Sequence, residues 1–574
     1  MGRDNASMHV SHIVSRRGEK EYHSWLVRRS YRENGKVKHE TIANVSKLPM
    51  DAIDALRLAL AHKPVIEAGS DFEITSTKKL GAGSLLLALS RQSSLIGALG
   101  QDCKESRLAL GMIIAQAINR SSKLAMCSYL PTTTLADDLG ITGGDVDDYY
   151  SALDWLGSNQ DAIESHLIKS HLKEGSMLLY DLSSSYMEGT KCPLSRYGYS
   201  RDKKRGKLQI EYGVVATTTG LPLAVRVFDG NTSDPASFRS VVDDLAKTHK
   251  LTKVVIVGDR GMFSSANISH LGKLDPSYLY VSALRSTQIR SLIQDGAIQL
   301  ELFDDTDLAE ITHPNYPGER LVAARNEVLG RRRGIERQEL LRVATERLDV
   351  LVAQVEAKKV KSEAAIGRRV ERALHSTKMG KHIITEIGEG SFSYTLDEAS
   401  IAAEARLDGI YVIRTTVSAD DASPADVVSY YKNLANLERT FRSMKNIDIK
   451  VRPVRHYLKD RVRAHVFACA LSAHLLHLAR ERLAELTFRD EEPPVPASPV
   501  AKKVVSESAR TKASTKLNAN ATEVMSFRSL LGELDTMVRS TIRIKGTGVT
   551  FQKTSTPTPI QARAFELIGA KIPV

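Results

Sequence analysis

The sequence predicts an α/β protein built around a mixed five-stranded sheet with helices, which a mainly helical insertion interrupts. Three strand-like segments with short turns follow Gly175: "SMLLYDLSSSYMEG", "LQIEYGVVATTTG" and "LPLAVRVFDGN". A helical segment, "DPASFRSVVDDLAKTHK", then leads to the apolar run "KVVIVGD", and "YLYVSAL" supplies a fifth strand. A continuous apolar run between turns is typical of a buried parallel strand, so the sheet is expected to be mixed.

Three antiparallel strands, a helix and a buried parallel strand follow one another in ribonuclease-H-like cores. We expect such a core at residues 173–285 and, after an insertion at residues 286–408, at residues 409–488. A chain of 574 residues is too long for a single hydrophobic core, so further domains are expected on both sides.

The first 75 residues predict a β-hairpin region. Apolar and polar residues alternate on both sides of Asn34-Gly35, and this dipeptide is the strongest short-range signal for a hairpin turn. The positions expected to be exposed carry Arg28, Arg29, Arg32, Lys36 and Lys38. They predict a ribbon that contacts DNA phosphates or, equally, a solvated hairpin face. Residues 76–172 show helical spacing, which predicts a mainly helical region.

The insertion contains a long charged segment, Asn326–Lys378, with helical spacing. A narrow apolar seam runs along it: Leu341, Ala344, Leu348, Leu351 and Val355. Such a seam must pack against another surface. It predicts a long exposed hairpin or coiled arm, which either acts on another molecule or braces only its own chain.

The second half of the core is expected to be helical. "SPADVVSYYKNLANLERTFRSMK" begins with a capping box of Ser423 and Asp426 and has Pro424 at the first helical position. A second helix is expected from about Tyr457 to Leu483. Residues 489–522 are rich in Pro, Ala, Ser and Lys, which predicts a flexible linker, and residues 523–574 would form a small basic module.

Composition limits the class of protein. The chain has 80 Lys and Arg against 68 Asp and Glu, a net charge of +12, which favours polyanionic partners. Its four cysteines are scattered without a CxxC pair, which argues against disulfides and thiolate zinc sites and suits a reducing cytosol. The N-terminus has no signal-peptide core, and no apolar run approaches the ~18 residues that cross a bilayer. We expect a cytoplasmic protein without membrane contact.

Two predicted strands end near a carboxylate, Asp181 in "SMLLYD" and Asp259 in "VIVGD". Because the first and fourth strands are neighbours in the predicted core, both side chains would lie at one edge of the sheet. Two carboxylates this close repel each other unless cations neutralise them, and Mg²⁺ prefers such oxygen ligands. Two ions about 4 Å apart could hold both oxygens of a phosphoryl displacement. For Asp259 alone, a helix N-cap is the alternative.

Glu438 is the candidate for a third acid. Positions three or four residues apart place one set of side chains on a single helix face: Tyr431, Leu434, Glu438, Phe441 and Lys445. A glutamate on an apolar stripe is out of place unless a charged group meets it. The alternative is a surface ion pair with Arg442.

These residues carry a family resemblance. The chain resembles bacterial insertion-sequence DDE transposases of the group marked by a Tyr-x2-Arg-x3-Glu-x6-Lys signature. The matching pieces, in the order of that family, are "YDLSSSYMEG", "YGYSRDKKRGKLQIEYGVV", "VFDGNTSDPASF", "VGDRGMFS" and "YYKNLANLERTFRSMK…RPVRHYLKDRVRAHVFACAL". The resemblance implies that Asp181, Asp259 and Glu438 are the catalytic and metal-binding carboxylates.

The resemblance also implies that residues 76–172 are a DNA-binding or dimerisation region, and it implies which groups contact DNA. Tyr431 and Lys445 match the signature, whereas Leu434 stands where the signature has Arg. Arg439 or Arg442 would replace that contact with a phosphate of the transposon end. The loop Ser195–Lys207 adds a basic cluster of Arg201, Lys203, Lys204 and Arg205, which would hold backbone phosphates beside the metals or form a solvated turn.

Cofactors and partners follow from the same resemblance. We expect two Mg²⁺ ions, with Mn²⁺ as a substitute, and double-stranded DNA as both transposon end and target. A homodimer is expected in the synaptic complex, and the protein would associate with the nucleoid. Three functions remain open: a cut-and-paste transposase, a metal-dependent endonuclease without strand transfer, and a catalytically silent repressor of the element.

Overall fold

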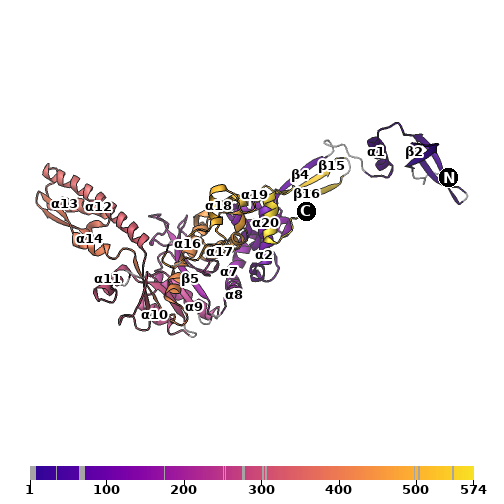
Figure 1. Ribbon diagram of the computed structural model, residues 1–574. Helices are drawn as coiled ribbons and strands as arrows, with labels where there is room; N and C mark the ends of the chain where they lie inside the picture. The colour runs from indigo at the N-terminus through magenta and orange to yellow at the C-terminus, as the bar shows by residue number, and fades with distance from the viewer. Residues whose placement is uncertain are drawn as a thin grey trace. The chain divides into compact units, whose positions relative to one another are not determined.

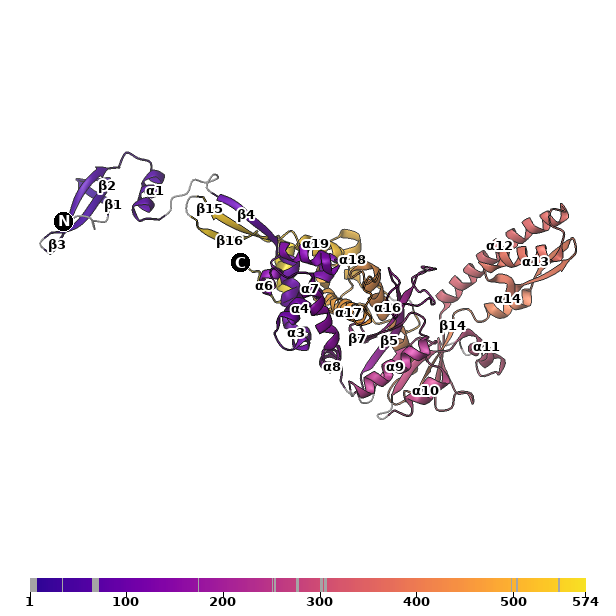
Figure 2. The same ribbon diagram turned by 180° about the vertical axis from the view of Figure 1, so that it is seen from behind.

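The computed structural model describes residues 8–33, 35–63, 72–173, 175–249, 251, 254–274, 278–299, 303, 307–496, 498–501, 504–545 and 548–573. The chain forms two compact units (Figures 1 and 2). One comprises residues 1–77 with 540–553, and the other comprises residues 78–539 with 554–574. Asn34 of the predicted hairpin turn and Lys253 at the start of the fourth predicted strand lie outside the described residues.

An eight-stranded mixed sheet forms the centre of the larger unit, in the order β10-β11-β14-β9-β8-β5-β6-β7. The five predicted strands are β5 (Met177–Tyr186), β6 (Gln209–Ala216), β7 (Pro222–Asp229), β8 (Val255–Gly258) and β9 (Leu279–Ala283). β5, β6 and β7 pair antiparallel, whereas β8 runs parallel to both β5 and β9. The prediction of a mixed sheet is therefore confirmed. The helices α9 (Asp234–Lys247), α10 (Ser265–Leu271) and α11 (Ser286–Gln294) connect or follow these strands.

Three further strands extend the sheet: β10 (Leu308–Ile311), β11 (Arg320–Arg325) and β14 (Ile410–Thr415). The prediction that residues 286–408 lie outside the core is therefore wrong for β10 and β11. The apolar centre of β11 is buried throughout, because this strand lies between β10 and β14. Arg325 at the end of β11 pairs with Ile410 at the start of β14. The helical insertion therefore leaves and re-enters the sheet between two directly paired residues.

The insertion has a core of its own. It contains α12 (Glu327–Glu356), α13 (Glu363–His375), β12 (Ile383–Gly388), β13 (Ser391–Leu396) and α14 (Glu398–Ala405). Figures 1 and 2 show α12 and α13 side by side. The predicted seam of α12 is buried and packs with Ile366 and Val370 of α13 and with Phe392 of β13. The seam is thus covered within its own chain, as in the helical-hairpin alternative.

Residues 78–172 supply a helical layer around one long core helix. Its helices are α2 (Gly81–Gln92), α3 (Ser94–Leu99), α4 (Lys104–Asn119), α5 (Lys123–Tyr129), α6 (Leu135–Asp138), α7 (Val146–Ser158) and α8 (Gln160–His171). They share a hydrophobic core with α17 (Lys459–Arg482). α17 is long and apolar enough to cross a membrane, although no apolar run of that length was expected from the sequence. Its apolar residues are interrupted by histidines. Its apolar window is 83% buried inside the protein, so it serves as a core helix.

The expected linker is partly structured. Within residues 489–522, α18 (Glu507–Thr515) buries Ala509 and Lys512, and the Lys512 ammonium donates to the Ala484 carbonyl at 3.1 Å. The same ammonium pairs with Glu491 at 3.1 Å. The prediction of a flexible linker is therefore wrong for this stretch, because tertiary contacts order a segment whose composition is polar.

The last residues do not form a separate module. α19 (Phe527–Leu534) and α20 (Pro559–Ile568) pack against α2, and their apolar side chains belong to the same core as α17. The contact is close, because a Cβ at Gly81 would lie 2.0 Å from the Leu534 carbonyl oxygen. The prediction of an independent module at residues 523–574 is therefore wrong, because much of this segment completes the core of the larger unit.

The smaller unit begins with a three-stranded antiparallel sheet of β1 (Met8–Arg17), β2 (Lys20–Glu33) and β3 (Lys36–Asn44), followed by α1 (Met50–Leu60). β2 and β3 are the strands of the predicted hairpin, and β1 was missed because its sequence is rich in polar residues. Lys36 is exposed, whereas Arg28 and Arg29 are half-buried and not fully exposed as predicted. A further sheet joins β4 (Phe72–Lys79), β15 (Val538–Ile544) and β16 (Thr550–Thr554).

Candidate active site

Asp181 and Asp259 lie side by side at the end of one parallel ladder. The pairing of β5 with β8 ends at Tyr180 and Gly258, and the two aspartates are the next residues on the two strands. The Asp181 Oδ1 atom accepts a hydrogen bond from the Leu182 amide at 2.8 Å, and the Asp259 Oδ1 atom accepts one from the Arg260 amide at 2.8 Å. Ser264, and not Asp259, caps α10. The alternative reading of Asp259 as a helix cap is therefore wrong.

The pair creates a local excess of negative charge. Burial raises the pKa of Asp181 from its usual value of 3.8 to about 7, and the neighbouring Asp259 charge contributes in the same direction. Two neighbouring carboxylates repel each other, and a hard divalent cation that binds their oxygen atoms removes this repulsion. The two residues therefore fit such an ion. Within the described part of the chain, no three His, Cys, Asp or Glu side chains are grouped closely enough to hold a metal together.

The helix that carries Glu438 is divided. The structure has α15 (Pro424–Lys432), α16 (Leu434–Arg442) and a π-helical turn at Ser443–Ile447. The capping box at the start of α15 is as predicted. However, the prediction of a single helix with one buried face from Tyr431 to Lys445 is wrong. Phe441 and Lys445 are buried, whereas Glu438 is exposed. The break at Asn433 and the wider turn after Arg442 change which residues share a face.

Glu438 nevertheless lies on a helix that contacts the site strand, because α16 packs against β5. Among the described residues, Glu438 forms no ion pair with Arg442, so the surface-pair alternative is not observed. Tyr431 at the end of α15 reaches the aspartates directly: its hydroxyl donates to the Asp259 Oδ1 atom at 3.5 Å. Burial raises the pKa of Tyr431, and the Asp259 charge adds to that shift. The hydroxyl therefore stays protonated as a hydrogen-bond donor to the site.

Two residues predicted to hold phosphates are engaged inside the protein. Arg201 is half-buried and forms ion pairs with Glu211 of β6 and with Asp234 at the start of α9. Lys445 is buried and pairs with Asp202 at 2.9 Å. Burial lowers the pKa of Lys445, and Asp202 opposes that shift. In this structure both cations neutralise carboxylates of their own chain.

Sequence reasoning missed three of these acids: Asp202, Glu211 and Asp234. One signal was present, since Glu211 is a charged residue inside the otherwise apolar run "LQIEYGVVA". Burial raises the pKa of Glu211 to about 7, and the Arg201 charge opposes the shift. Asp234, at the start of α9, lies close enough to Gly261 that a Cβ there would be 3.1 Å from its carboxylate oxygen. It therefore borders the turn that carries Asp259.

The other predicted phosphate contacts are accessible. Lys203, Lys204 and Arg205 are exposed in the loop between β5 and β6. Arg439 and Arg442 are exposed on α16 and line a cavity of about 600 Å³. Arg480 and Arg489 contribute to the same cavity, as do the aromatic rings of Phe488 and Phe527. Arg480 is paired with Asp448 there. This surface combines positive charge with apolar walls one helical turn beyond Glu438.

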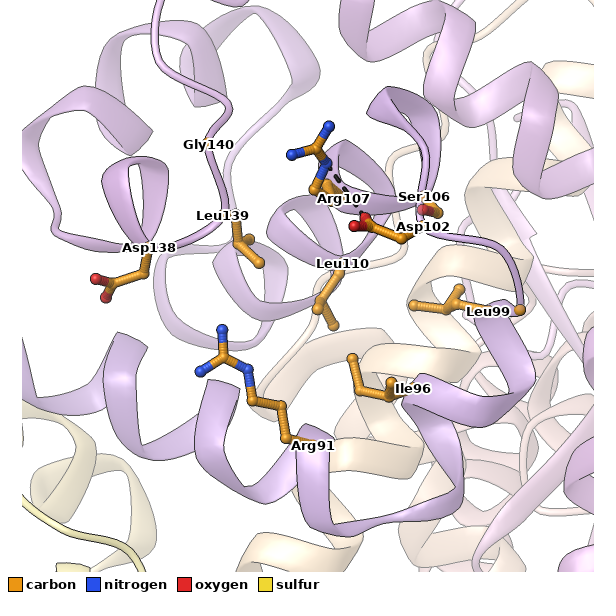
Figure 3. A pocket seen from close by; sticks show the side chains of 11 residues that line it. Arg91, Ile96, Leu99, Asp102, Ser106, Arg107, Leu110, Asp138, Leu139 and Gly140 are labelled. Carbon is orange, nitrogen blue, oxygen red and sulfur yellow. Dashed lines mark ion pairs between the residues drawn. The ribbon is translucent and has the colours of Figure 1, made fainter.

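A second cavity, of about 400 Å³, lies among the helices α2, α3, α4 and α6 (Figure 3). Arg91 and Arg107 lie on opposite sides of it with Leu110 between them, and Arg107 pairs with Asp102 at 3.3 Å. None of the three predicted carboxylates lines it. This cavity is therefore separate from the candidate active site.

Comparison with known proteins now decides the family. A model of the transposase DDE domain matches residues 174–475, more than half of the chain. A model of the N-terminal domain of IS1634 family transposases matches residues 12–68. The chain is an insertion-sequence DDE transposase. The matched DDE segment contains Asp181, Asp259 and Glu438 of the transposase, and members of this family depend on a divalent metal ion.

Among solved structures, the transposase is similar to a cryo-EM structure of a piggyBac transposase synaptic complex with hairpin DNA. The TM-score is 0.35 at 10% sequence identity, and the match covers 70% of this chain and 72% of the other. No curated protein matches the transposase.

The raised pKa of Asp181 predicts a pH-dependent stability in the absence of metal. Because the folded state binds this proton up to about pH 7 and the unfolded state only to about 3.8, the stabilising contribution of protonation is complete below pH 4 and is lost as the pH rises through 7. Asp181→Asn has no such loss. In urea unfolding with EDTA, the variant should be more stable than the parent by about 2–4 kcal/mol at pH 8. The difference should shrink toward pH 4, and a difference that is constant between these values would contradict the argument.

Proposed function

We propose that the transposase cleaves and joins DNA in a cut-and-paste reaction through Asp181, Asp259 and Glu438, held by a ribonuclease-H-like core. The observation that carries this proposal is the adjacency of Asp181 and Asp259 at the end of the β5–β8 ladder. The packing of α16 against β5 supports Glu438 as the third acid, because it brings the helix with Glu438 next to the strand with Asp181. The exposure of Glu438 leaves its carboxylate accessible to substrate and ions.

The cofactor in this proposal is a pair of Mg²⁺ ions, with Mn²⁺ as a substitute. When bound, such ions neutralise phosphate charge and lower the pKa of an attacking water or hydroxyl. The protein's own groups set the ligand geometry. The amides of Leu182 and Arg260 and the hydroxyl of Tyr431 each donate to an aspartate oxygen, which leaves other oxygen lone pairs for the metals.

Contacts with DNA are proposed on three surfaces. Arg439 and Arg442 would contact the transposon end beside Glu438, since both are exposed there and hydrogen-bond to no carboxylate within the described residues. Lys203, Lys204 and Arg205 would contact backbone phosphates near the strand ends. Arg28, Arg29 and Lys36 of the N-terminal sheet would bind the terminal repeats. Tyr431, Lys445 and Arg201 are instead assigned to holding the site, because each has a partner inside the protein.

Two other functions use the same residues. A metal-dependent endonuclease would share the three carboxylates and lack strand transfer, and a silent repressor would bind DNA only. Incubating the protein with labelled terminal-repeat DNA and Mg²⁺ distinguishes the three through joined products, cut products or bound DNA alone. The full set of carboxylates counts against a silent repressor, and the matches to a transposase DDE domain and to an IS1634 family transposase N-terminal domain favour transposition over cleavage alone.

A homodimer and an association with the nucleoid complete the proposal. Joining two transposon ends in one event requires two active sites or two bound ends. The outer face of the insertion carries exposed cations that suit the DNA backbone of a partner, including Arg331, Arg332 and Arg333. A protein that binds double-stranded DNA in the cytoplasm of a bacterium would reside on the nucleoid.

The first prediction concerns the carboxylates. Asp181→Ala, Asp259→Ala and Glu438→Ala should each abolish cleavage and joining in Mg²⁺, whereas affinity for end DNA should be retained, because loss of negative charge does not weaken phosphate binding. Asp154→Ala, which removes a surface partner of Arg461, is the control and should cut at the parental rate. Near-parental cutting by any of the three site variants would show that this set of carboxylates is wrong.

The second prediction concerns the surface beside Glu438. Arg442→Ala should weaken binding to end DNA and reduce the slope of log affinity against log salt by about one unit, the contribution of one phosphate contact. Arg463→Ala is a matched control on the nearby α17, because Asp460 already pairs with that arginine at 3.2 Å. Fluorescence anisotropy over a salt series measures both slopes. Equal slopes for Arg442→Ala and the parent would remove Arg442 from the DNA surface.

The third prediction concerns assembly. Replacing residues 326–409 with an Asn-Gly turn joins Arg325 directly to its pairing partner Ile410, so the sheet should remain folded. If the insertion acts on the partner, this variant should bind one end but should not pair two ends on a native gel. The triple variant of Arg331, Arg332 and Arg333 to alanine keeps the insertion and tests its charge alone. Normal paired-end complexes from the deletion variant would exclude the role of the insertion in assembly.

A further inference from the structure

Two adjacent residues of opposite charge, Arg201 and Asp202, connect parts of the site that are far apart in sequence. Both belong to the loop between β5 and β6, and this loop is attached to β5 by two hydrogen bonds. The Arg201 amide donates to the Ser184 hydroxyl at 3.0 Å, and the Tyr186 amide donates to the Asp202 Oδ2 atom at 3.2 Å. β5 is also the strand that carries Asp181. The loop is therefore fixed to the same strand as the first catalytic carboxylate.

From this anchor the two side chains bind different elements. Arg201 forms ion pairs with Glu211 and Asp234, on the side of the sheet edge where Asp234 borders the Asp259 turn. Asp202 forms ion pairs with Lys445 and Arg452. Lys445 lies in the π-helical turn that directly follows α16, and Arg452 lies in the segment after it. The loop thus joins the two-aspartate edge to the C-terminal end of the helix that carries Glu438.

The ion pairs of Asp202 are buried, so breaking them is costly. The Asp202 side chain is 1% exposed and the Lys445 side chain is 10% exposed. Removing one partner of a buried ion pair leaves the other charge desolvated without compensation. If Asp202 lost its charge, Lys445 and Arg452 would both be buried charges without a carboxylate partner in this contact. The π-helical turn would then be drawn toward solvent, and α16 would move with it.

We propose that Arg201 and Asp202 form a clasp that sets the position of α16, and so of Glu438, relative to Asp181 and Asp259. Arg201 and Asp202 are positioning residues in this proposal, and they contact neither substrate nor metal. The proposal rests on the proposed function in one respect, because it takes Glu438 as the third carboxylate. It also explains why Lys445 is buried against a carboxylate and does not face solvent.

The test compares Asp202→Asn with a matched buried pair elsewhere in the sheet. Glu319→Gln removes the partner of Arg414, and those side chains are 7% and 12% exposed. Hydrogen exchange is measured first, in EDTA. Amides of residues 434–447 should exchange at least ~10-fold faster in Asp202→Asn than in the parent, and they should be unchanged in Glu319→Gln. This readout requires neither metal nor activity.

Cleavage and binding provide the second readout. In single-turnover assays with Mg²⁺, Asp202→Asn should cut terminal-repeat DNA ~100-fold more slowly than the parent, the effect of a misplaced catalytic group. Affinity for the same DNA in EDTA should stay within about threefold. Asp202→Glu should recover part of the rate. Lys445→Gln, which leaves Asp202 paired with Arg452, is the milder variant if Asp202→Asn does not fold, and it should show the same two effects to a smaller extent.

Three results would overturn the clasp. One is unchanged exchange of residues 434–447 in Asp202→Asn, and the second is a parental cleavage rate in that variant. The third is an equal loss of cleavage in Glu319→Gln, since this would show a general effect of stability. A parental protein that cuts no DNA would contradict the proposed function instead, and the exchange measurement would still decide whether Asp202 positions α16.

Discussion

The parallel pairing of β5 with β8 is the constraint on which the site depends. The ladder ends at Tyr180 and Gly258, and beyond that point β5 continues beside β6 while the chain after β8 turns away. Asp181 therefore remains inside a strand, and Asp259 begins a turn next to it. A slip of one residue in this register would send the Asp181 side chain to the opposite face of the sheet and separate the two carboxylates. The buried positions along β5 and β6 oppose such a slip.

The carboxylates around the two site aspartates are neutralised by cations of the same chain. Arg201, Lys445 and Arg452 each face a carboxylate of the same chain, so these positive groups are held in fixed places. Arg439 and Arg442 face outward on α16. The site therefore separates two kinds of cation. Inner ones fix the geometry of the elements, and outer ones remain accessible to an anionic polymer.

The two site aspartates could be predicted from the sequence because their pattern is local: an apolar strand followed by a carboxylate. The order of five strands could be predicted as well, since each has a clear apolar run between turns. The exposure of Glu438 was not predictable in this way, because it depends on the break at Asn433 and on the turn that Asp202 and Lys445 hold together. β11 and α18 were missed for a related reason. Short or polar segments acquire their structure from neighbours that are distant in the chain, and periodicity does not report those neighbours.

The close contact between Gly81 of α2 and Leu534 of α19 has a consequence for synthesis on the ribosome. α2 is made before the strands of the central sheet, whereas α17, α19 and α20, which cover it, are made after them. Until those helices emerge, the apolar faces of the early helices have no native cover, and the nascent chain is exposed to aggregation or to chaperone binding. The larger unit can thus complete its core only after α20 has been synthesised. A chain that terminated before α19 would retain the central sheet but would have an open core.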